Sequence, residues 1–352
     1  MVGNIPDTMR AVRFSRTGGP EVLATEAVPV PEPGPGEVLL HLGAASVNHL
    51  DVWLRSGALP VALPHTPGSD GAGVAIALGP GVTGVEIGGR YVIYPGLSCG
   101  FCSHCVVGQG QRCDRFSILG TVSAGTYAPF VAIPARNLVP LPDHLDDLHA
   151  ACLPVAGITA WHLLVTRAGV TAGETVLVHG AGSGLGIFAI QIARLHGARV
   201  LATAGSAEKC RLAQDLGAEA CFDHTSGNIP EKVLEATGGA GAQVVFDHVG
   251  AALFAGNLKA LAVGGRLLVC GTTSGGEVKF NLRDLFARQQ TMYGARLGGI
   301  SDLHQVVSHA AAGRIRAVID QVFPLPRADE AHARMEARTH FGKIVLNARP
   351  KR

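Results

Sequence analysis

A glycine-rich turn between a short apolar run and a helical pattern constrains the fold of this chain more than any other feature. The apolar run is Thr175–Val178, the turn His179–Gly186 reads His-Gly-Ala-Gly-Ser-Gly-Leu-Gly, and apolar residues follow at helical spacing over Leu185–His196. Glycines let a backbone approach a pyrophosphate, and a helix N-terminus offers N–H groups and a favourable dipole. This order predicts a dinucleotide site in a parallel α/β sheet. The spacing departs slightly from G-x-G-x-x-G, and an ordinary glycine-rich turn is the alternative.

The same alternation of apolar runs and helical segments extends over residues 156–297. Runs that are apolar on both faces suit strands buried beneath helices on both sides of a sheet. Strand–helix units of this length predict a Rossmann domain with a doubly wound parallel sheet. The expected strands are Thr175–His179, Arg199–Thr203, Ala220–Asp223, Gln243–Asp247, Arg266–Cys270 and Thr291–Tyr293, and the expected helices include Leu185–His196, Ala207–Leu216, Asn257–Leu261 and Leu282–Gln290.

Residues 1–155 have a different, β-rich pattern. Short apolar or alternating runs are separated there by Pro and Gly, which is typical of strands joined by turns. A chain of 352 residues is long enough for two domains with a core each. The expected strands of this first domain are Val38–Leu42, Gly73–Leu78, Arg90–Tyr94 and Ala128–Ile133.

Four cysteines form a compact cluster in the first domain, within a lobe at residues 96–115. Cys99, Cys102, Cys105 and Cys113 have the spacing C-x2-C-x2-C-x7-C. Four thiolates complete the tetrahedral coordination of zinc and leave no position for water or substrate. We therefore expect one structural zinc per chain, with a reversible disulfide switch as the alternative.

The end of the second Rossmann strand indicates which dinucleotide binds. NAD sites usually place Asp or Glu there to accept from the ribose hydroxyls. This chain has no carboxylate at that point and instead has Ser206, Lys209 and Arg211, which suit a 2′-phosphate. The pattern predicts NADPH rather than NADH. Glu208 is the counterargument, although it lies inside the next helix, and Ser206 is also a plausible helix N-cap.

Charge and hydropathy narrow the possible partners. The net charge is +2 with no cluster of Lys and Arg, so nucleic-acid binding is not expected. No apolar run approaches membrane-spanning length, and the N-terminus has no export-signal pattern. These features predict a cytoplasmic protein that acts on a small molecule, without nucleic acid or membrane.

Several motifs in order make the chain resemble the medium-chain dehydrogenase/reductase superfamily. The resemblance implies a GroES-like catalytic domain at residues 1–155, a Rossmann domain at 156–297, and a tail at 298–352 that returns to the catalytic domain. The tail carries an expected helix at Asp302–Ala311 and extended segments at Val318–Phe323 and Lys343–Leu346. Besides the cysteine lobe and the glycine-rich turn, the motifs are Ala45–Asp51, Pro67–Gly73, Ala156–Trp161 and Gly342–Leu346.

The resemblance also bears on a second, catalytic zinc. Zinc alcohol dehydrogenases of the superfamily hold that zinc with a cysteine, a His-Glu pair and a further cysteine. The matching positions here are Asn48, Ser69 with Asp70, and Val155. An amide, a hydroxyl and a valine cannot form an open three-ligand zinc site. The resemblance implies a protein without catalytic zinc; the alternative is a second metal site built from Asp70 with a nearby Cys or His.

The stretch Asn48–Gly57 is similar to the zinc-independent quinone oxidoreductase branch, with Trp53 where that branch usually has Tyr. Asn48 would donate to the substrate oxygen, and Asp51 would orient Asn48 or accept from the cofactor ribose. Trp53 would form an apolar wall, His49 would supply a proton, and Asp70 would be a buried acid paired to a cation such as Lys343. The resemblance implies cofactor contacts from Thr159, Gly180, Gly182, Ser183, Gly184, Leu185, Gly186, Ser206, Lys209, His224, Gly271 and Lys343.

These residues predict an NADPH-dependent oxidoreductase that transfers hydride to a quinone or an α,β-unsaturated carbonyl without catalytic zinc. The substrate would be apolar with one carbonyl or quinone oxygen. The first alternative is an alcohol dehydrogenase or carbonyl reductase that works without zinc or with an atypical zinc. The second is a non-catalytic NADPH-binding protein. Relatives are dimers or tetramers, so a homodimer or homotetramer is expected, with pairing near residues 291–297.

Overall fold

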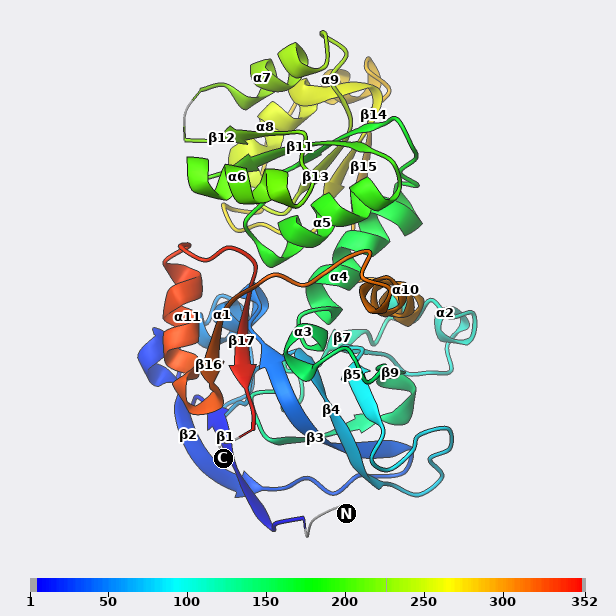
Figure 1. The fold of residues 1–352 in the computed structure, drawn as a ribbon, viewed down its shortest axis with the longest axis vertical. Helices are drawn as coiled ribbons and strands as arrows, with labels where there is room; N and C mark the ends of the chain where they lie inside the picture. The colour runs from blue at the N-terminus through cyan, green and yellow to red at the C-terminus, as the bar shows by residue number, and fades with distance from the viewer. Residues whose placement is uncertain (1–4, 226, 350–352) are drawn as a thin grey trace. The chain divides into compact units, whose positions relative to one another are not determined.

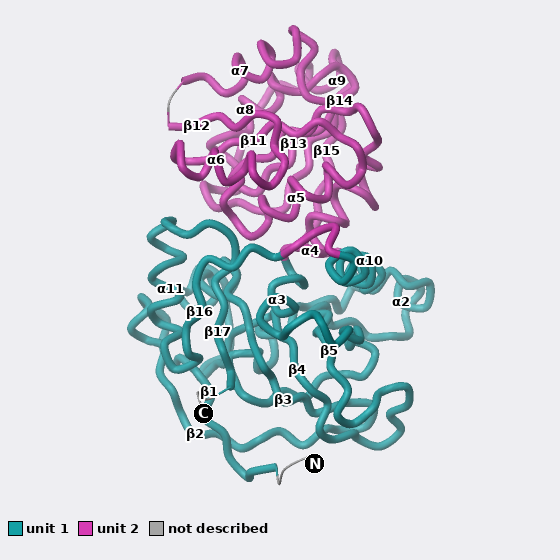
Figure 2. Tube along the Cα trace, viewed as in Figure 1, with its two compact units in different colours: residues 1–155, 299–312, 317–352 teal, residues 156–298, 313–316 magenta. Residues whose placement is uncertain are grey.

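The computed structural model describes residues 5–225 and 227–349. The chain divides into two compact units, each of which we describe by itself (Figure 2). Unit 1 comprises Met1–Val155, Gly299–Ala312 and Ala317–Arg352, and unit 2 comprises Ala156–Gly298 and Gly313–Arg316. Within the described residues, no helix is long and apolar enough to cross a membrane.

Unit 2 is built on a six-stranded sheet in which all neighbouring strands are parallel (Figure 1). The strand order β12-β11-β10-β13-β14-β15 is that of a doubly wound nucleotide-binding sheet, which confirms the predicted fold class. The order reverses between β10 and β13, where such sheets bind ligands beyond the carboxyl ends of their strands. The strands are β10 (Thr175–Val178), β11 (Arg199–Ala204), β12 (Ala220–Asp223), β13 (Ala242–Asp247), β14 (Leu261–Val269) and β15 (Thr291–Gly294).

Helices connect these strands and cover the sheet. Helices α5 (Gly184–Leu195) and α6 (Ala207–Asp215) pack on β10–β12, whereas α8 (Ala251–Ala260) packs on β13 and β14 and is flanked by α7 (Ile229–Ala236). Helix α8 is longer than expected at its start and ends where β14 begins. Helix α9 (Leu282–Phe286) is shorter than expected, because Gln289 has a left-handed backbone with φ 53° that helical residues do not adopt. Helix α4 (Pro154–Trp161) and a π-helical segment (His162–Arg167) precede β10.

Unit 1 contains a sheet of seven strands in the order β16-β17-β3-β4-β5-β9, with β8 paired to β3 (Figure 1). Its strands are β3 (Glu37–Ser46), β4 (Asp70–Leu78), β5 (Arg90–Ile93), β8 (Phe130–Pro134), β9 (Leu138–Pro140), β16 (Ile319–Pro324) and β17 (Lys343–Asn347). Two small two-stranded antiparallel sheets, β1 (Thr8–Arg13) with β2 (Ala24–Pro29) and β6 (Gly96–Leu97) with β7 (Ser117–Ile118), complete the strands. Its helices are α1 (His49–Ser56), α2 (Ser103–Val106), α3 (Asp147–Ala150), α10 (Ile300–Ala311) and α11 (Ala328–Glu336).

The antiparallel pairing of β17 with β3 positions the expected site residues of unit 1. Val345 lies opposite Ser46 and Leu346 opposite Ala45, so the end of β3 meets the start of β17. Apolar side chains of both strands, such as Leu42 and Ile344, are fully buried in one core cluster. This rigid pairing brings Lys343 beside the residues that follow β3.

Candidate functional site

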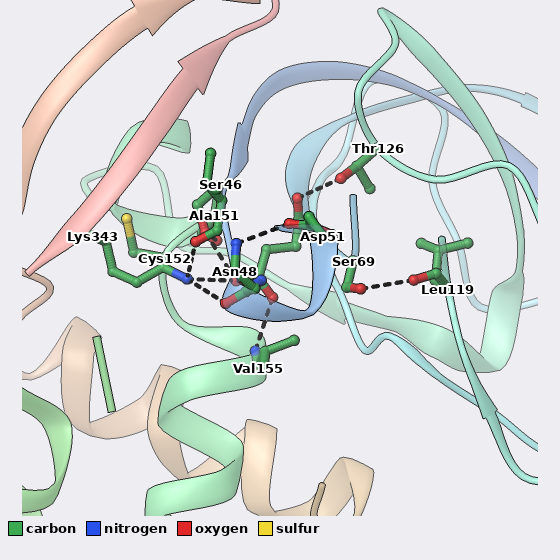
Figure 3. A network of polar contacts seen from close by, with 12 residues as sticks. Ser46, Asn48, Asp51, Ser69, Leu119, Thr126, Ala151, Cys152, Val155 and Lys343 are labelled. Carbon is green, nitrogen blue, oxygen red and sulfur yellow. Dashed lines mark hydrogen bonds and ion pairs between the residues drawn. The ribbon is translucent and has the colours of Figure 1, made fainter. Parts of the chain in front are cut away.

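A buried carboxylate, Asp70, organises the polar site of unit 1. Figure 3 labels the residues that donate to it, which are Ser46, Asn48, Val155 and Lys343. Its Oδ2 atom accepts hydrogen bonds from Asn48 Nδ2 at 2.9 Å and from Lys343 Nζ at 3.0 Å. Ser46 Oγ also lies 2.9 Å from Oδ2, and the Val155 backbone N–H donates to Oδ1 at 2.8 Å. A fully buried carboxylate is tolerated because these donors and one counter-charge replace its hydration.

Lys343 supplies that counter-charge from the first residue of β17. Its side chain is 3% exposed, and its Nζ atom lies 2.7 Å from Asn48 Oδ1, 3.0 Å from Asp70 Oδ2 and 3.2 Å from the Val47 carbonyl oxygen. An ammonium has three hydrogens and no acceptor capacity. Lys343 therefore donates all three hydrogens to protein oxygens of unit 1. The expected ion pair between Asp70 and Lys343 is present.

Asn48 connects the ion pair to helix α1, for which it is the N-cap residue. Its backbone N–H donates to Asp51 Oδ2 at 2.8 Å, which fixes the backbone at the start of the helix. Its side-chain oxygen accepts from Lys343, and one Nδ2 hydrogen goes to Asp70. Within the described residues, the second Nδ2 hydrogen has no acceptor. The cation on Oδ1 withdraws electron density from the amide, so this remaining hydrogen is a strengthened donor.

The other residues expected in this site lie on or near α1. His49 and Trp53 share one face of the helix and form an edge-to-face ring pair with centroids 5.2 Å apart. Asp51 is fully buried, and burial raises its pKa to about 7. Cys152 is buried near the ion pair (Figure 3), and its thiol donates to the Leu148 carbonyl at 3.2 Å. Burial raises the pKa of the Cys152 thiol to about 12, so the thiol is protonated near neutral pH.

The four lobe cysteines converge as their spacing predicted. Their Sγ atoms all lie within 4.8 Å of one another, with 3.8 Å between Cys99 and Cys105 and 3.5 Å between Cys102 and Cys105. A tetrahedral zinc with Zn–S bonds of about 2.3 Å needs sulfur atoms about 3.8 Å apart, so the cluster fits a zinc ion. Across residues 5–225 and 227–349, no other group of three Cys, His, Asp or Glu side chains gathers its ligand atoms in this way.

The residues of unit 2 that were expected to bind the dinucleotide gather at the carboxyl edge of the parallel sheet. The glycine-rich turn follows β10, and Gly180 has φ 60°, a backbone that favours glycine. A Cβ atom on Gly186 would lie 2.3 Å from the Gly180 carbonyl oxygen, so only glycine permits this approach of helix to turn. Ser183 caps α5 by accepting from the Gly186 N–H at 2.9 Å. The N–H groups of Gly184 and Leu185 have no partner inside the helix and can meet a pyrophosphate.

A series of buried side-chain hydrogen bonds stabilises the backbone at the start of this turn. His179 Nε2 lies 2.7 Å from Asn257 Oδ1, and Asn257 Nδ2 donates to Asp247 Oδ2 at 2.9 Å. Because the amide oxygen can only accept, His179 carries its proton on Nε2, and Nδ1 accepts from Thr203 Oγ1 at 3.0 Å. Burial lowers the pKa of His179 to about 4, which keeps the ring neutral. These hydrogen bonds therefore fix the ends of β10, β11 and β13 relative to one another, at the point where the strand order reverses.

The residues that were expected at the adenosine end also meet at this edge. Ser206 follows β11 and caps α6, where its hydroxyl oxygen accepts from the Lys209 N–H at 3.2 Å. His224 follows β12, and its Nε2 atom would lie 3.3 Å from a Cβ atom on Gly205. The hydroxyl proton of Ser206 is left to donate, so a hydroxyl and an imidazole lie at the small loop around Gly205.

Two of the expected cofactor residues belong to elements other than the glycine-rich turn. Thr159 is buried in α4, and Lys343 belongs to unit 1, where three protein oxygens occupy its ammonium. Gly271 follows β14 at the same sheet edge as the turn, within contact distance of His248.

The sequence did not indicate three residues of these polar networks, Ser46, Asp247 and Asn257. The signal that could have found Asp247 is a single carboxylate that ends an otherwise apolar strand.

Two family models match the chain. The model of the alcohol dehydrogenase GroES-like domain matches residues 34–143, and the model of zinc-binding dehydrogenases matches residues 184–312. A quinone oxidoreductase from Rattus norvegicus is 34% identical over 348 residues, which cover 96% of this chain and 97% of the relative. The chain belongs to the medium-chain dehydrogenase/reductase superfamily. The predicted GroES-like and Rossmann-type folds are thereby confirmed, and the protein is an oxidoreductase of this superfamily.

Solved structures of other superfamily members are also similar. A structure described as an NAD-dependent alcohol dehydrogenase is 46% identical with a TM-score of 0.93, and the match covers 96% of this chain and 99% of that one. A cobalt- and zinc-bound thermostable alcohol dehydrogenase from Pyrobaculum aerophilum is 36% identical with a TM-score of 0.88, covering 97% and 99%. The relatives of this medium-chain dehydrogenase/reductase thus include enzymes named for quinones and enzymes named for alcohols.

Proposed function

We propose that this medium-chain dehydrogenase/reductase uses NADPH to reduce a quinone or an α,β-unsaturated carbonyl, with no metal at the Asp70 site. The observation that carries the proposal is the buried ion pair between Asp70 and Lys343. The ammonium stands where a cation would neutralise this carboxylate, and a second cation beside it would be repelled. The other positions that match the catalytic-zinc ligands of zinc alcohol dehydrogenases carry no charged metal ligand, because they are Asn48, Ser69 and Val155.

The charge that the reaction creates decides which acceptors such a site can serve. NADPH, when bound, supplies a hydride. A simple carbonyl that takes the hydride becomes an alkoxide, which normally needs a Lewis acid or a strong proton donor. A quinone or enone becomes a delocalised phenolate or enolate, which hydrogen bonds can stabilise. The free, cation-strengthened Nδ2 hydrogen of Asn48 is a donor of the kind that this oxyanion needs.

The same polar network fixes the direction of that donor. Lys343 and Asp70 hold the two ends of the Asn48 amide, and Asp51 holds its backbone N–H. A preoriented donor costs no reorganisation when charge develops. Trp53, which shares a partly buried face of α1 with His49, would then form the apolar wall of the substrate site.

A preference for NADPH is supported by the set of residues around Gly205. We expect Ser206→Asp to lower kcat/KM for NADPH by about 10- to 100-fold while leaving NADH unchanged or improved, because a carboxylate repels a 2′-phosphate and replaces a charge-assisted hydrogen bond. Aspartate caps helices as well as serine, so α6 should be retained. Steady-state kinetics with both cofactors give the measurement, and Ser206→Thr is the matched control. Equal losses for NADPH and NADH would contradict a role for Ser206 at the phosphate.

A second candidate function is the oxidation of an alcohol or the reduction of a simple carbonyl. It is favoured by the 46% identity to a protein described as an NAD-dependent alcohol dehydrogenase. NADPH oxidation with a quinone, an enone and a simple aldehyde separates the two candidates. The proposed function predicts turnover of the quinone or enone at least tenfold above that of the aldehyde, and the reverse order would favour the second candidate.

The proposal also covers the structural zinc, the localisation and the oligomeric state of this enzyme. We propose one structural zinc per chain in the lobe, supported by the convergence of its four thiols. The proposal extends to a cytoplasmic homodimer or homotetramer. The outer edge of β15 is supported as the pairing region by its place at the end of the unit 2 sheet.

A further inference from the structure

A second buried polar cluster lies behind Asn48, between α1, α11 and the loop that carries Tyr127. Asp51, Tyr127 and His332 are each 0% exposed. The Tyr127 hydroxyl oxygen lies 3.3 Å from Asp51 Oδ2 and 3.0 Å from His332 Nε2. The three side chains come from segments far apart in the sequence, yet they form one continuous row of hydrogen bonds.

Both ends of this row carry an atom without a partner. Asp51 Oδ1 and His332 Nδ1 are buried and have no hydrogen-bond partner. A buried polar atom without a partner costs desolvation energy, so the two ends of the row are the places where a further proton donor or acceptor would bind. The other side-chain N and O atoms of these three residues have hydrogen-bond partners. Only the two end atoms can therefore form a further hydrogen bond.

The chemistry of the three groups allows a proton to move along the row. In one arrangement His332 Nε2–H donates to the Tyr127 oxygen, and the Tyr127 hydroxyl donates to the Asp51 carboxylate. In the other arrangement Asp51 is protonated and donates to Tyr127, Tyr127 donates to His332 Nε2, and the His332 proton is on Nδ1. The second arrangement differs from the first by one proton that entered at His332 Nδ1. Each hydrogen bond only reverses its direction, so no heavy atom has to move.

The surroundings of the row favour this exchange near neutral pH. Burial raises the pKa of Asp51 to about 7; Asp70 adds to the rise, and the Asn48 N–H, Lys343 and Tyr127 oppose it. Burial, helped by Arg55 and His49, lowers the pKa of His332 to about 3, so the ring stays neutral and keeps one donor and one acceptor nitrogen. Burial also raises the pKa of Tyr127, which therefore remains a hydroxyl.

Arg55 lies near the outer end of the row, since its charge helps to lower the pKa of His332. Its guanidinium is buried, with Nε and Nη1 unpartnered, while Nη2 donates to Glu336. The Glu336 side chain is 37% exposed. Arg55 therefore carries unpartnered donors, and His332 carries an unpartnered acceptor at Nδ1. Figure 1 shows α1 and α11 side by side, as their contact requires.

We propose that His332, Tyr127 and Asp51 form a proton relay that carries a proton from the α11 surface to the substrate site beside Asn48. This inference rests on the proposed function, in which the acceptor takes H⁻ from NADPH and the resulting enolate or phenolate takes H⁺. Asp51 releases that proton and regains one from Tyr127, Tyr127 regains one from His332 Nε2, and His332 gains one at Nδ1 from water. In the overall reaction, the acceptor, NADPH and one H⁺ are consumed, and the reduced acceptor and NADP⁺ are formed.

Nuclear magnetic resonance of the unliganded full chain tests the relay without any substrate. With ¹⁵N-labelled histidine, His332 is expected to carry its proton on Nε2 at high pH and on Nδ1 at low pH. The change should occur at the same pH as the titration of Asp51, observed by ¹³C-carboxyl labelling. Tyr127→Phe should abolish the change of tautomer while Asp51 still titrates. A single His332 tautomer throughout the Asp51 titration in the wild-type chain would overturn the proposal.

Kinetics give the second readout. In Tyr127→Phe the protonation step should slow by about 10²-fold, which is a typical contribution of a positioned proton donor. The solvent deuterium isotope effect on kcat should rise, whereas KM for NADPH should not change. Tyr91→Phe is the matched control, because Tyr91 is also buried in unit 1 and its hydroxyl accepts from the Glu86 N–H at 3.0 Å. If no quinone or enone is turned over while the coupled titration is present, the proposed function fails and the relay geometry stands.

Discussion

Replacing Lys343 with methionine should lower the free energy of unfolding by about 3–5 kcal/mol, because it leaves a buried carboxylate without its counter-charge. Asp70 is 0% exposed, and its Oδ2 atom faces the ammonium at 3.0 Å. Methionine has nearly the same length as lysine, so the substitution removes charge and hydrogen bonds more than volume. Urea unfolding at neutral pH measures the change.

A double substitution separates the charge effect from packing. Lys343→Met combined with Asp70→Asn should recover a large part of the lost stability, since the buried charge is then absent from both sides. The control is Arg327→Met, because Arg327 and Glu330 form an exposed pair in the same unit that should contribute less than about 1 kcal/mol. If Lys343→Met costs no more than this control, the ion pair is not what neutralises Asp70.

Asn48→Ala should lower kcat by about 10²–10³-fold, because it removes the donor that faces the developing oxyanion. The fall should appear in kcat more than in KM, since the interaction is strongest in the transition state. Stopped-flow measurement of NADPH oxidation with the best acceptor of the panel tests this. The amide is buried at 8% exposure, so a loss of stability is also expected and has to be measured separately.

Asn137→Ala is the matched control for that experiment. Asn137 is a buried amide of the same unit that donates to the Tyr94 and Gly96 carbonyls at 2.8 Å each. It should cost stability as Asn48→Ala does while leaving kcat within about threefold of wild type. If the two variants lose kcat equally, Asn48 acts through folding and not through the substrate oxygen.

The sequence was sufficient for the parallel sheet because its strands are apolar on both faces and alternate with helices. It also indicated the pairing of Asp70 with Lys343, although only the resemblance brought the tail to the first domain. The antiparallel register of β17 on β3 explains that placement physically. A register between strands almost 300 residues apart leaves no periodic trace in the sequence.

The proton relay could not have been predicted in the same way. Tyr127 and His332 are 205 residues apart and meet only in the folded chain. Helix α11, which carries His332, has the polar sequence Ala-Asp-Glu-Ala-His-Ala-Arg-Met-Glu, without the broad apolar stripe that marks a buried helix. Three of its small or flexible residues, Ala328, Ala331 and Met335, are nevertheless buried. Small alanines pack closely without adding much hydrophobic signal.

The most direct test of hydride transfer without a metal at Asp70 is one assay that combines zinc content and turnover on the same sample. Zinc is quantified per chain, and NADPH oxidation is followed with a quinone, an enone and an aldehyde. We predict one zinc per chain and turnover of the quinone or enone but not of the aldehyde. Two zinc ions per chain together with turnover of the aldehyde would contradict the account, because a metal would then occupy the place assigned to Lys343.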